Sequence, residues 1–272
     1  MPCHSRAPMR ECFFVIMSTF FSDARRIAAG VVFLTCAAVT PTKAADKVMV
    51  SVPPLHSLVS ILLDGVDTPG LMIPDAAGLT AKPDADLVDA ADLIVWTGPT
   101  YETGLASVRA ADPAVSLKGL TVTMTVPLLS FAHPNIQDRS TGVQDMRFWL
   151  DPRLAKVAVS RIAPNLTRVY PTQSDRILEN EVALKKRLKQ VEMHIRHALE
   201  SVNGVPLHVP DSDILYLAWR FNLTVPRCAG AAAKAEGFSR RPGPGLYYEM
   251  MNDLLAELKR CQALDRKTAE TS

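Results

Sequence analysis

The sequence predicts an α/β fold with two parallel-sheet lobes joined by a long backbone helix, the second lobe being truncated. Three observations support this class. Between residues 47 and 124, short apolar segments alternate with helical patterns, as in a parallel sheet covered on both faces. Residues 153 to 203 are helical in pattern throughout. After residue 204 only two strand and two helix patterns remain, which is marginal for an independent core.

The first lobe opens with a strand, KVMVSV (47–52), followed by a helix that begins at Pro54 and ends at Gly65. The apolar residues of this helix recur at the spacing of one buried face. They are Leu55, Leu58, Val59, Leu62 and Leu63.

Further strands and helices alternate along the rest of this lobe. LMIP (71–74) ends a second strand, DADLVDA (84–90) is a short helix, and DLIVW (92–96) has the continuous apolar character of a buried parallel strand. Thr100 is expected to cap the next helix, and LTVTM (120–124) to form another strand.

The connecting region begins at Asp151 and Pro152, an N-cap followed by proline at the first helical position. Pro164 is expected to kink or break this helix, and Pro171 to mark a restart. The second helix carries one apolar stripe before Asn203 and Gly204. Its members are Leu184, Leu188, Val191, Ile195, Ala198 and Val202.

In the second lobe, VPLHV (205–209) and LTVP (223–226) are predicted strands, and Asp211 or Ser212 caps the helix between them. Residues 227–245 are small, basic and without period, as in a loop. A last amphipathic helix follows, with an apolar stripe of Tyr247, Met250, Met251, Leu254, Leu255, Leu258 and Cys261. The predicted organisation is therefore signal peptide 1–44, N-terminal α/β lobe 45–150, connecting helices 151–203 and short C-terminal α/β lobe 204–272.

The N-terminal segment has the features of an export signal. Arg25 and Arg26 precede an apolar run (27–39) that is too short for a membrane span, and Thr42 and Ala44 suit cleavage after Ala44. A membrane anchor or buried helix is the alternative reading of the run. Met1 and Met17 are both possible starts, and the exported chain is expected in the periplasm.

Cleavage after Ala44 leaves only Cys228 and Cys261 in the mature chain. In an oxidising compartment, two remaining cysteines suggest one disulfide. Two free, buried cysteines are the alternative, because sequence spacing does not show that the pair is within reach.

Composition excludes several classes of function. The chain has 272 residues, 48% hydrophobic and 21% charged, with a net charge of +2, so it is neither disordered nor strongly basic. Basic residues are spread along the chain, which argues against a nucleic-acid partner. No phosphate-binding loop, nucleophile elbow or H-E-x-x-H motif is present, so an enzyme is not expected.

Several segments together resemble one family. They are SVPPLHSLVSILLDGV, ADLIVWTGPTYE, FWLDP, YLAWRFNLTV and PGPGLYYEMMNDLLAEL. In this order they resemble the zinc-uptake solute-binding proteins, the periplasmic components of metal ABC importers. The resemblance implies two α/β lobes joined by a long helix, with a metal ion in the cleft that is passed to a membrane permease.

The ligands that this resemblance implies are mostly replaced. The family has a histidine a few residues before the proline matched by Pro83, where this chain reads DAAGLTAK with only Asp75 as a donor. A second histidine, two residues before the tryptophan of FWLDP, is matched by Arg147, a permanent cation that repels a metal ion. The third position is matched by Asp211.

A late carboxylate completes the family's ligand set. The strand and helix that would carry it are missing around residues 227–243. The sequence therefore indicates a divergent member that lacks most of the family's metal ligands.

Other residues could rebuild a zinc site, for which neutral imidazole is a preferred ligand. His56 follows the first strand, at the carboxyl edge where such sheets bind ligands, although a polar residue on the outer side of that turn is the favoured alternative. His133 lies in a polar loop, and His194 and His197 share a face of the long helix without a third donor nearby.

His208 and Asp211 form the best remaining pair, at a strand end and helix start, where Asp211 could instead act as a cap. We therefore expect zinc, if bound, to be held by His208, Asp211 and His56. Two functions remain open at this point. One is the metal-binding component of an ABC importer, with its permease as partner. The other is an exported interaction protein or metal chaperone on the same fold.

Overall fold

The computed structural model describes residues 46–130, 144–199, 215–221 and 237–270. The predicted signal peptide, the strands expected at 205–209 and 223–226, and the second sheet they would form lie outside these residues. None of the helices in the described part of the chain combines the length and apolar character that a membrane span requires.

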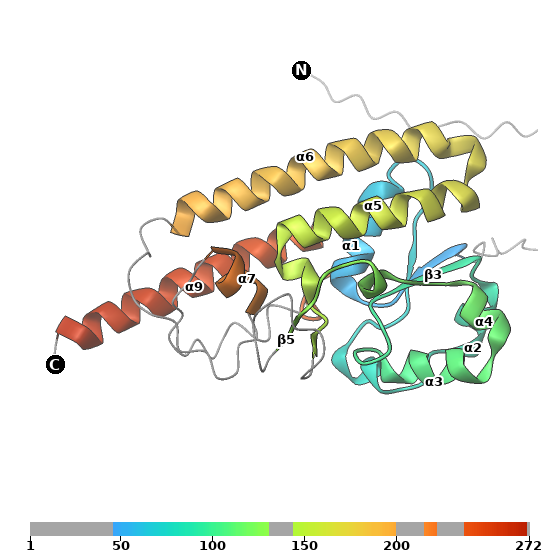
Figure 1. The fold of residues 1–272 in the computed structure, drawn as a ribbon, viewed down its shortest axis with the longest axis horizontal. Coiled ribbons are helices and arrows are strands. Elements are labelled where there is room, and N and C mark those ends of the chain that lie inside the picture. Colours follow the sequence, from blue (N-terminus) through green and yellow to red (C-terminus); the bar gives the residue numbers. More distant parts are fainter. Residues whose placement is uncertain (1–45, 131–143, 200–214, 222–236, 271–272) are drawn as a thin grey trace, which may run out of the picture. The chain divides into compact units, whose positions relative to one another are not determined.

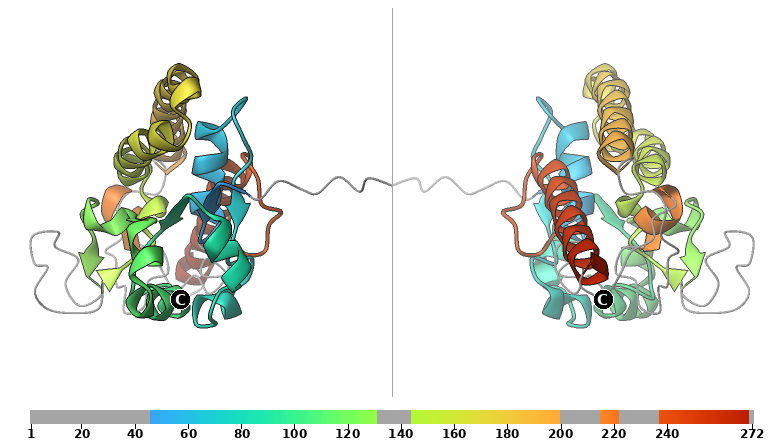
Figure 2. Two further views of the ribbon diagram at one scale, coloured as in Figure 1. Left: turned by 90° about the vertical axis from the view of Figure 1, so that its right-hand side faces the viewer. Right: turned by 90° about the vertical axis from the view of Figure 1, so that its left-hand side faces the viewer.

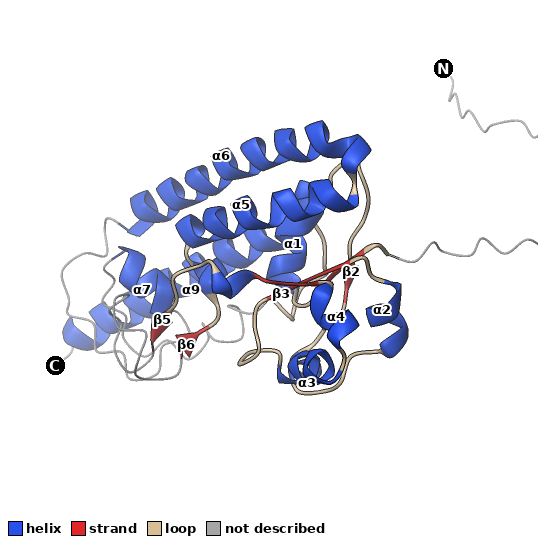
Figure 3. Cartoon of the chain, turned by 45° about the vertical axis from the view of Figure 1, so that its right-hand side comes forward, coloured by secondary structure: helices blue, strands red, loops and turns tan. Residues whose placement is uncertain are grey.

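A four-stranded parallel sheet forms the centre of the described structure (Figure 3). Its strands are β1 (Val48–Val50), β2 (Gly70–Leu71), β3 (Leu93–Trp96) and β4 (Gly119–Thr121). They lie in the order β2-β1-β3-β4, with Met49 opposite Gly70 and Ile94, and with Ile94 opposite Gly119. The predicted parallel sheet of the first lobe is confirmed.

Helices cover both faces of this sheet. Successive side chains of a strand point to opposite faces, and here both faces are apolar and need covering. Val48 and Val50 belong to a large core, whereas Met49 between them belongs to a smaller one. The large core contains residues of α1 (Pro53–Leu62), α5 (Pro152–Val169), α6 (Ser174–Leu199) and α9 (Leu246–Glu270). The smaller one contains residues of α2 (Ala85–Ala90), α3 (Thr103–Ala111) and α4 (Pro113–Leu117), which lie on the other side of the strands in Figure 3.

The end of α1 is fixed by its own sequence and by α6. Gly65 has φ +75°, a left-handed conformation that favours glycine, so the predicted helix end is confirmed. The side-chain amide of Asn180 donates to the carbonyl oxygens of Leu62 and Asp64 at 3.0 and 2.9 Å. These bonds satisfy carbonyl groups that the helix leaves unpaired at its end.

The connecting helices α5 and α6 lie side by side (Figure 1). Asp151 caps α5 by accepting a hydrogen bond from the Arg153 amide at 2.8 Å, as predicted. Of the two outcomes expected at Pro164, the break is wrong, because α5 continues through it to Val169, and the kink stays a prediction. Buried residues on both sides of the proline, Ala163 among them, hold the helix against the core and offset the lost backbone bond.

The restart after α5 is confirmed. A short 3-10 turn, η4 (Pro171–Gln173), leads into α6, whose 26 residues span about 39 Å. From the predicted stripe of α6, Leu184, Leu188 and Ile195 are buried.

Two local predictions in the first lobe need correction. Thr100 does not cap α3, which begins at Thr103 after Glu102. The strand expected over 120–124 ends at Thr121 and becomes a 3-10 turn, η2 (Val122–Met124). A second short sheet follows, in which β5 (Leu129–Ser130) and β6 (Gln144–Asp145) are antiparallel. The structure also adds a 3-10 turn, η1 (Ala76–Leu79), after β2.

The last helix packs against the first lobe, beside α1 (Figure 2). The Tyr247 amide donates to Ser57 Oγ at 3.0 Å, and the Tyr247 hydroxyl donates to the carbonyl oxygen of Trp149 at 2.9 Å. The predicted apolar stripe of this helix is buried from Tyr247 to Leu258; the side chain of Cys261 lies outside the described part. Although α9 belongs to the predicted second lobe (204–272), it completes the core of the first.

Candidate functional site

The strand order places a topological switch point at the carboxyl ends of β1 and β3. The chain passes from β1 to β2 on one side and from β3 to β4 on the other, so the connections diverge between these central strands. Open α/β sheets bind ligands at such a switch point. Ser51 follows β1 here and Thr97 follows β3, and both are fully buried.

Glu102 lies at this edge with its carboxylate buried. Oε1 accepts from the Ser51 hydroxyl at 2.6 Å and the Thr97 amide at 2.9 Å, and Oε2 accepts from the Gly98 amide at 2.7 Å. Burial raises the pKa of Glu102, although these hydrogen bonds oppose the rise. The carboxylate therefore fixes the loop after β3 to the end of β1, and its oxygens are occupied by the protein's own donors.

The FWLDP segment meets the same edge. Its aromatic residues form a 3-10 turn, η3 (Phe148–Leu150), and the Trp149 ring contacts the Tyr101 ring edge-on with centroids 5.7 Å apart. Arg147 precedes this turn and is buried. The residue that the family resemblance matches to a metal position thus lies directly before this turn.

Arg147 forms an internal ion pair with Asp145. Its Nε donates to Oδ1 at 2.9 Å and its second guanidinium nitrogen to Oδ2 at 3.2 Å, a bidentate geometry. The Arg147 amide also donates to Oδ1 at 2.9 Å. Both side chains are almost wholly buried, at 8% and 1% exposed. The charge of Arg147 is therefore compensated within the chain, and Asp145 is engaged rather than available to a metal ion.

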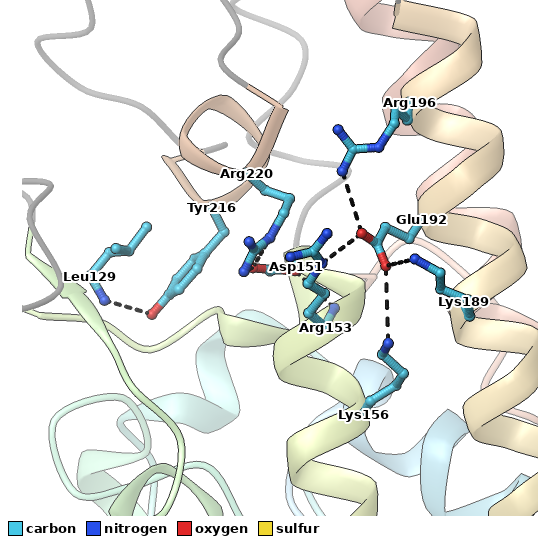
Figure 4. Close-up of polar contacts among 9 residues, drawn as sticks. All are labelled: Leu129, Asp151, Arg153, Lys156, Lys189, Glu192, Arg196, Tyr216 and Arg220. Atoms are coloured by element: carbon cyan, nitrogen blue, oxygen red, sulfur yellow. Dashed lines mark hydrogen bonds and ion pairs between the residues drawn. The ribbon is translucent and has the colours of Figure 1, made fainter.

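Helix α7 (Leu215–Phe221), from the predicted second lobe, is attached to the first lobe through Tyr216 and to α5 through Arg220 (Figure 4). The buried Tyr216 hydroxyl accepts from the Leu129 amide at 3.1 Å and donates to the Asp145 carbonyl oxygen at 2.6 Å. Burial raises the pKa of Tyr216, so the hydroxyl stays protonated. Arg220 Nε donates to Asp151 Oδ2 at 2.6 Å. Asp151 thus caps α5 through one oxygen and binds α7 through the other.

A second charged cluster joins α5 to α6 (Figure 4). The Glu192 carboxylate, 1% exposed, is surrounded by four cations, with Arg153 at 2.6 Å, Lys189 at 3.3 Å, Arg196 at 3.4 Å and Lys156 at 4.0 Å. Burial alone would raise the pKa of Glu192, but hydrogen bonds from Arg153 and Lys189 outweigh it and lower the pKa. The cluster is structural, because its one carboxylate is already paired.

His56 is placed differently from the expectation. Its Nε2 lies 3.0 Å from the carbonyl oxygen of Pro69, just before β2, and its Nδ1 lies 3.5 Å from Ser60 Oγ. Burial lowers the pKa of His56, so the ring is neutral and Nε2 carries the proton that Pro69 accepts. The ring is therefore directed to the amino end of β2 instead of the carboxyl edge.

The other candidate donors are either occupied or not described. Asp75 caps η1 by accepting from the Gly78 amide at 3.1 Å. His194 and His197 are exposed on α6. His133, His208, Asp211 and Cys228 lie outside the described residues. Within the described ranges no three His, Cys, Asp or Glu side chains come close enough to hold a metal ion.

The residues that sequence reasoning missed act over long range. Glu102 stands four residues after Gly98, and an acid just before a helix is a recognisable signal for binding backbone amides. Tyr216 and Arg220 are ordinary members of a helical pattern, and nothing in the sequence pairs them with Asp145 and Asp151.

These features together define a class of protein. A parallel sheet with a switch point between its central strands, next to a long helical hairpin, is the architecture expected for one lobe and the backbone helices of a solute-binding protein. The family described as zinc-uptake complex component A, periplasmic, matches residues 48–245. The chain belongs to this family, which supplies the metal-binding component of an ABC import system.

Curated relatives and solved structures agree with this membership. The high-affinity zinc uptake system protein ZnuA of Brucella abortus is 26% identical over 239 residues, covering 72% of this chain and 71% of that protein. The protein of the same name from Yersinia pestis is 25% identical over 185 residues, covering 59% of this chain and 58% of that protein. The binding protein FpvC of Pseudomonas aeruginosa, solved with Mn2+, has a TM-score of 0.59 at 16% identity. The match covers 79% of this chain and 99% of that chain. AdcAII of Streptococcus pneumoniae has a TM-score of 0.52 at 20% identity, covering 67% of each chain. These structures support the shared fold.

Proposed function

We propose that this chain is exported to the periplasm, with its signal peptide cleaved after Ala44, and binds zinc or a similar divalent ion for a membrane permease. The match to the zinc-uptake family over residues 48–245 carries the proposal. The switch point at the carboxyl ends of β1 and β3 supports it, because such an edge is where an open parallel sheet receives a ligand. In this role the protein captures and delivers an ion without transforming it, so no catalytic residues are assigned.

The ion site of this chain differs from that of a ligand-rich relative. At the position where the family resemblance expects a ligand, this chain has Arg147, whose positive charge is neutralised by Asp145. The carboxylates of Glu102 and Asp145 already accept hydrogen bonds from the chain. We assign the ion to His208 and Asp211, the donor pair that the sequence places at the start of the second lobe. His56 was the third predicted ligand, and its bond to Pro69 supports a structural role for it instead.

Calorimetry on the mature chain, residues 45–272, tests this proposal. We expect zinc or manganese to bind with a dissociation constant below about 10 μM. The double variant His208→Ala, Asp211→Ala should weaken binding at least about tenfold, since each lost donor removes a bond from a site of three or four ligands. The matched control His194→Ala, His197→Ala removes two exposed imidazoles and should bind like the parent. Absence of binding tighter than about 10 μM would exclude transport of these ions by this chain alone.

The buried Arg147–Asp145 pair favours a second candidate, an exported interaction protein or metal chaperone on the same fold. This pair places a permanent cation where the family resemblance expects a ligand. The same calorimetry separates the two functions. Equal zinc affinity of the parent and of the His208→Ala, Asp211→Ala variant would show that the ion, if bound, uses other donors.

We also propose a disulfide between Cys228 and Cys261, as expected for an exported chain with two cysteines. Thiol titration of the denatured, exported protein should detect no free thiol. Detection of two thiols per chain would refute the pair.

A further inference from the structure

A hollow of about 440 Å³ lies on the first lobe between α3, α4 and the edge strand β4. Its lining includes Trp96, Pro99, Arg109, Thr121 and Met124. Trp96 and Pro99 come from the end of β3 and the loop after it, and Met124 from the turn after β4. Neither Arg147 nor Asp145 belongs to this lining.

Arg109 carries a charge that no carboxylate in the described ranges compensates. Its guanidinium lies 4.3 Å from the centre of the Trp96 ring, and its terminal nitrogens donate to Thr121 Oγ1 at 3.3 Å and the Ser116 carbonyl oxygen at 3.0 Å. Its Nε is buried without a hydrogen-bond partner. Burial lowers the pKa of Arg109, and no neighbouring acid opposes that effect. By contrast, Arg147 and Arg220 are each paired with a buried aspartate.

The surroundings hold this guanidinium in one place. Trp96 is itself fixed by a hydrogen bond from its indole nitrogen to Thr121 Oγ1 at 2.8 Å. On another side, a Cβ added at Gly119 would lie 2.4 Å from the central carbon of the guanidinium, so only glycine leaves room for it. A cation fixed in this way loses little conformational freedom when it binds an anion.

Apolar side chains stand beside the hollow in full contact with solvent. Met124, in its lining, is 81% exposed, and Leu117, next to Ser116, is 90% exposed. These are the two most exposed large apolar side chains among the described residues. A small solute is usually enclosed by its site, whereas exposed apolar residues around a fixed charge are typical of a surface that binds another polypeptide.

We propose that this hollow binds a polypeptide segment of a partner that presents a carboxylate next to an apolar side chain. The carboxylate pairs with Arg109, which lacks a counterion in the described chain, and the apolar side chain packs on Met124 and Leu117. Arginine suits this role, because its planar fork can bind a carboxylate through two parallel hydrogen bonds. This surface is independent of ion binding, so it holds whether or not zinc is the solute.

The test uses the mature chain with 13C-methyl-labelled methionine and the blocked peptide acetyl-Leu-Glu-Leu-amide. The Met124 methyl signal, assigned with the Met124→Ala variant, should shift with a dissociation constant below about 1 mM. The matching peptide with glutamine in place of glutamate should bind at least about tenfold more weakly, since it lacks the charge. Arg109→Lys should weaken the glutamate peptide by a similar factor, because lysine cannot form the two-pronged bond.

Arg161→Lys is the matched control, since Arg161 is exposed on α5, away from the hollow, and should leave peptide binding unchanged. Circular dichroism checks that Arg109→Lys folds; if it does not, the glutamate and glutamine peptides on the parent chain decide alone. No Met124 shift at about 5 mM glutamate peptide, or equal binding of both peptides, would overturn the proposal. An equal shift with acetate at the same concentration would also overturn it, by showing a site for small anions.

Discussion

Replacing Tyr216 by phenylalanine removes one oxygen atom and two buried hydrogen bonds. The hydroxyl accepts from the Leu129 amide and donates to the Asp145 carbonyl oxygen. Leu129 and Asp145 are themselves opposite each other in the β5–β6 sheet. The hydroxyl therefore bridges one backbone group from each strand of this sheet.

The magnitude follows from these two bonds. At about 1 kcal/mol net for each, the loss is about 2 kcal/mol, and an unsatisfied buried backbone group costs about 1 to 3 kcal/mol. Partial re-pairing of Leu129 with Asp145 would recover some of this. We therefore expect Tyr216→Phe to lower the free energy of unfolding by about 2 to 3 kcal/mol. For a chain of this size the melting temperature should fall by about 4 to 12 °C.

Urea unfolding of the mature chain, followed by circular dichroism, measures this change. Tyr170→Phe is the matched control, because its hydroxyl makes one bond, to Asp67 Oδ2 at 2.6 Å, in a partly exposed setting. It should cost about 1 kcal/mol or less. A loss below about 0.5 kcal/mol for Tyr216→Phe, with unchanged slope, would refute the reasoning that α7 is fixed to the first lobe by this hydroxyl.

Two further predictions concern the loops at the sheet edge. Gly104→Ala should destabilise the chain by about 1 to 3 kcal/mol or more in urea unfolding, because the new Cβ would lie 1.8 Å from the Ala81 carbonyl oxygen. Gly245→Ala is the control, because its Cβ would meet only the flexible Glu249 side chain, at 3.2 Å, and it should change stability by less than about 0.5 kcal/mol. Equal losses of stability in the two variants would contradict the predicted clash at Gly104. Because burial raises the pKa of Glu102 above its ordinary 4.5, the stability it contributes is complete below that pH and is lost as pH rises through the folded pKa. We therefore compare the free energy of unfolding of the parent with that of Glu102→Gln. The difference, parent minus variant, should fall as pH rises above about 4.5, and a rise would be inconsistent with a raised pKa.

Much of the first lobe could be predicted from local patterns. Continuous apolar character placed β3, and an N-cap followed by proline placed the start of α5 at Asp151 and Pro152. These succeeded because both signals depend on residues adjacent in sequence. The expected break at Pro164 failed because tertiary packing of its buried neighbours outweighs a single lost backbone bond.

The candidate site was less predictable, since its polar contacts join distant segments. Tyr216 lies 71 residues from Asp145, and Arg220 lies 69 residues from Asp151. No periodicity links such pairs. The sequence did show that Arg147 replaces an expected ligand, but it did not show that Asp145, two residues away, neutralises it. His56 illustrates the converse, because its position after β1 suggested the sheet edge while its ring turns to Pro69.

The Glu192 cluster has a consequence for how the helical hairpin can move. Arg153 and Lys156 come from α5, whereas Lys189 and Arg196 flank Glu192 on α6. Sliding one helix past the other by a single turn, about 5.4 Å, would carry the carboxylate away from both α5 cations at once. The hairpin therefore has one favoured register, and any opening of the molecule should rotate α5 and α6 together as a rigid pair.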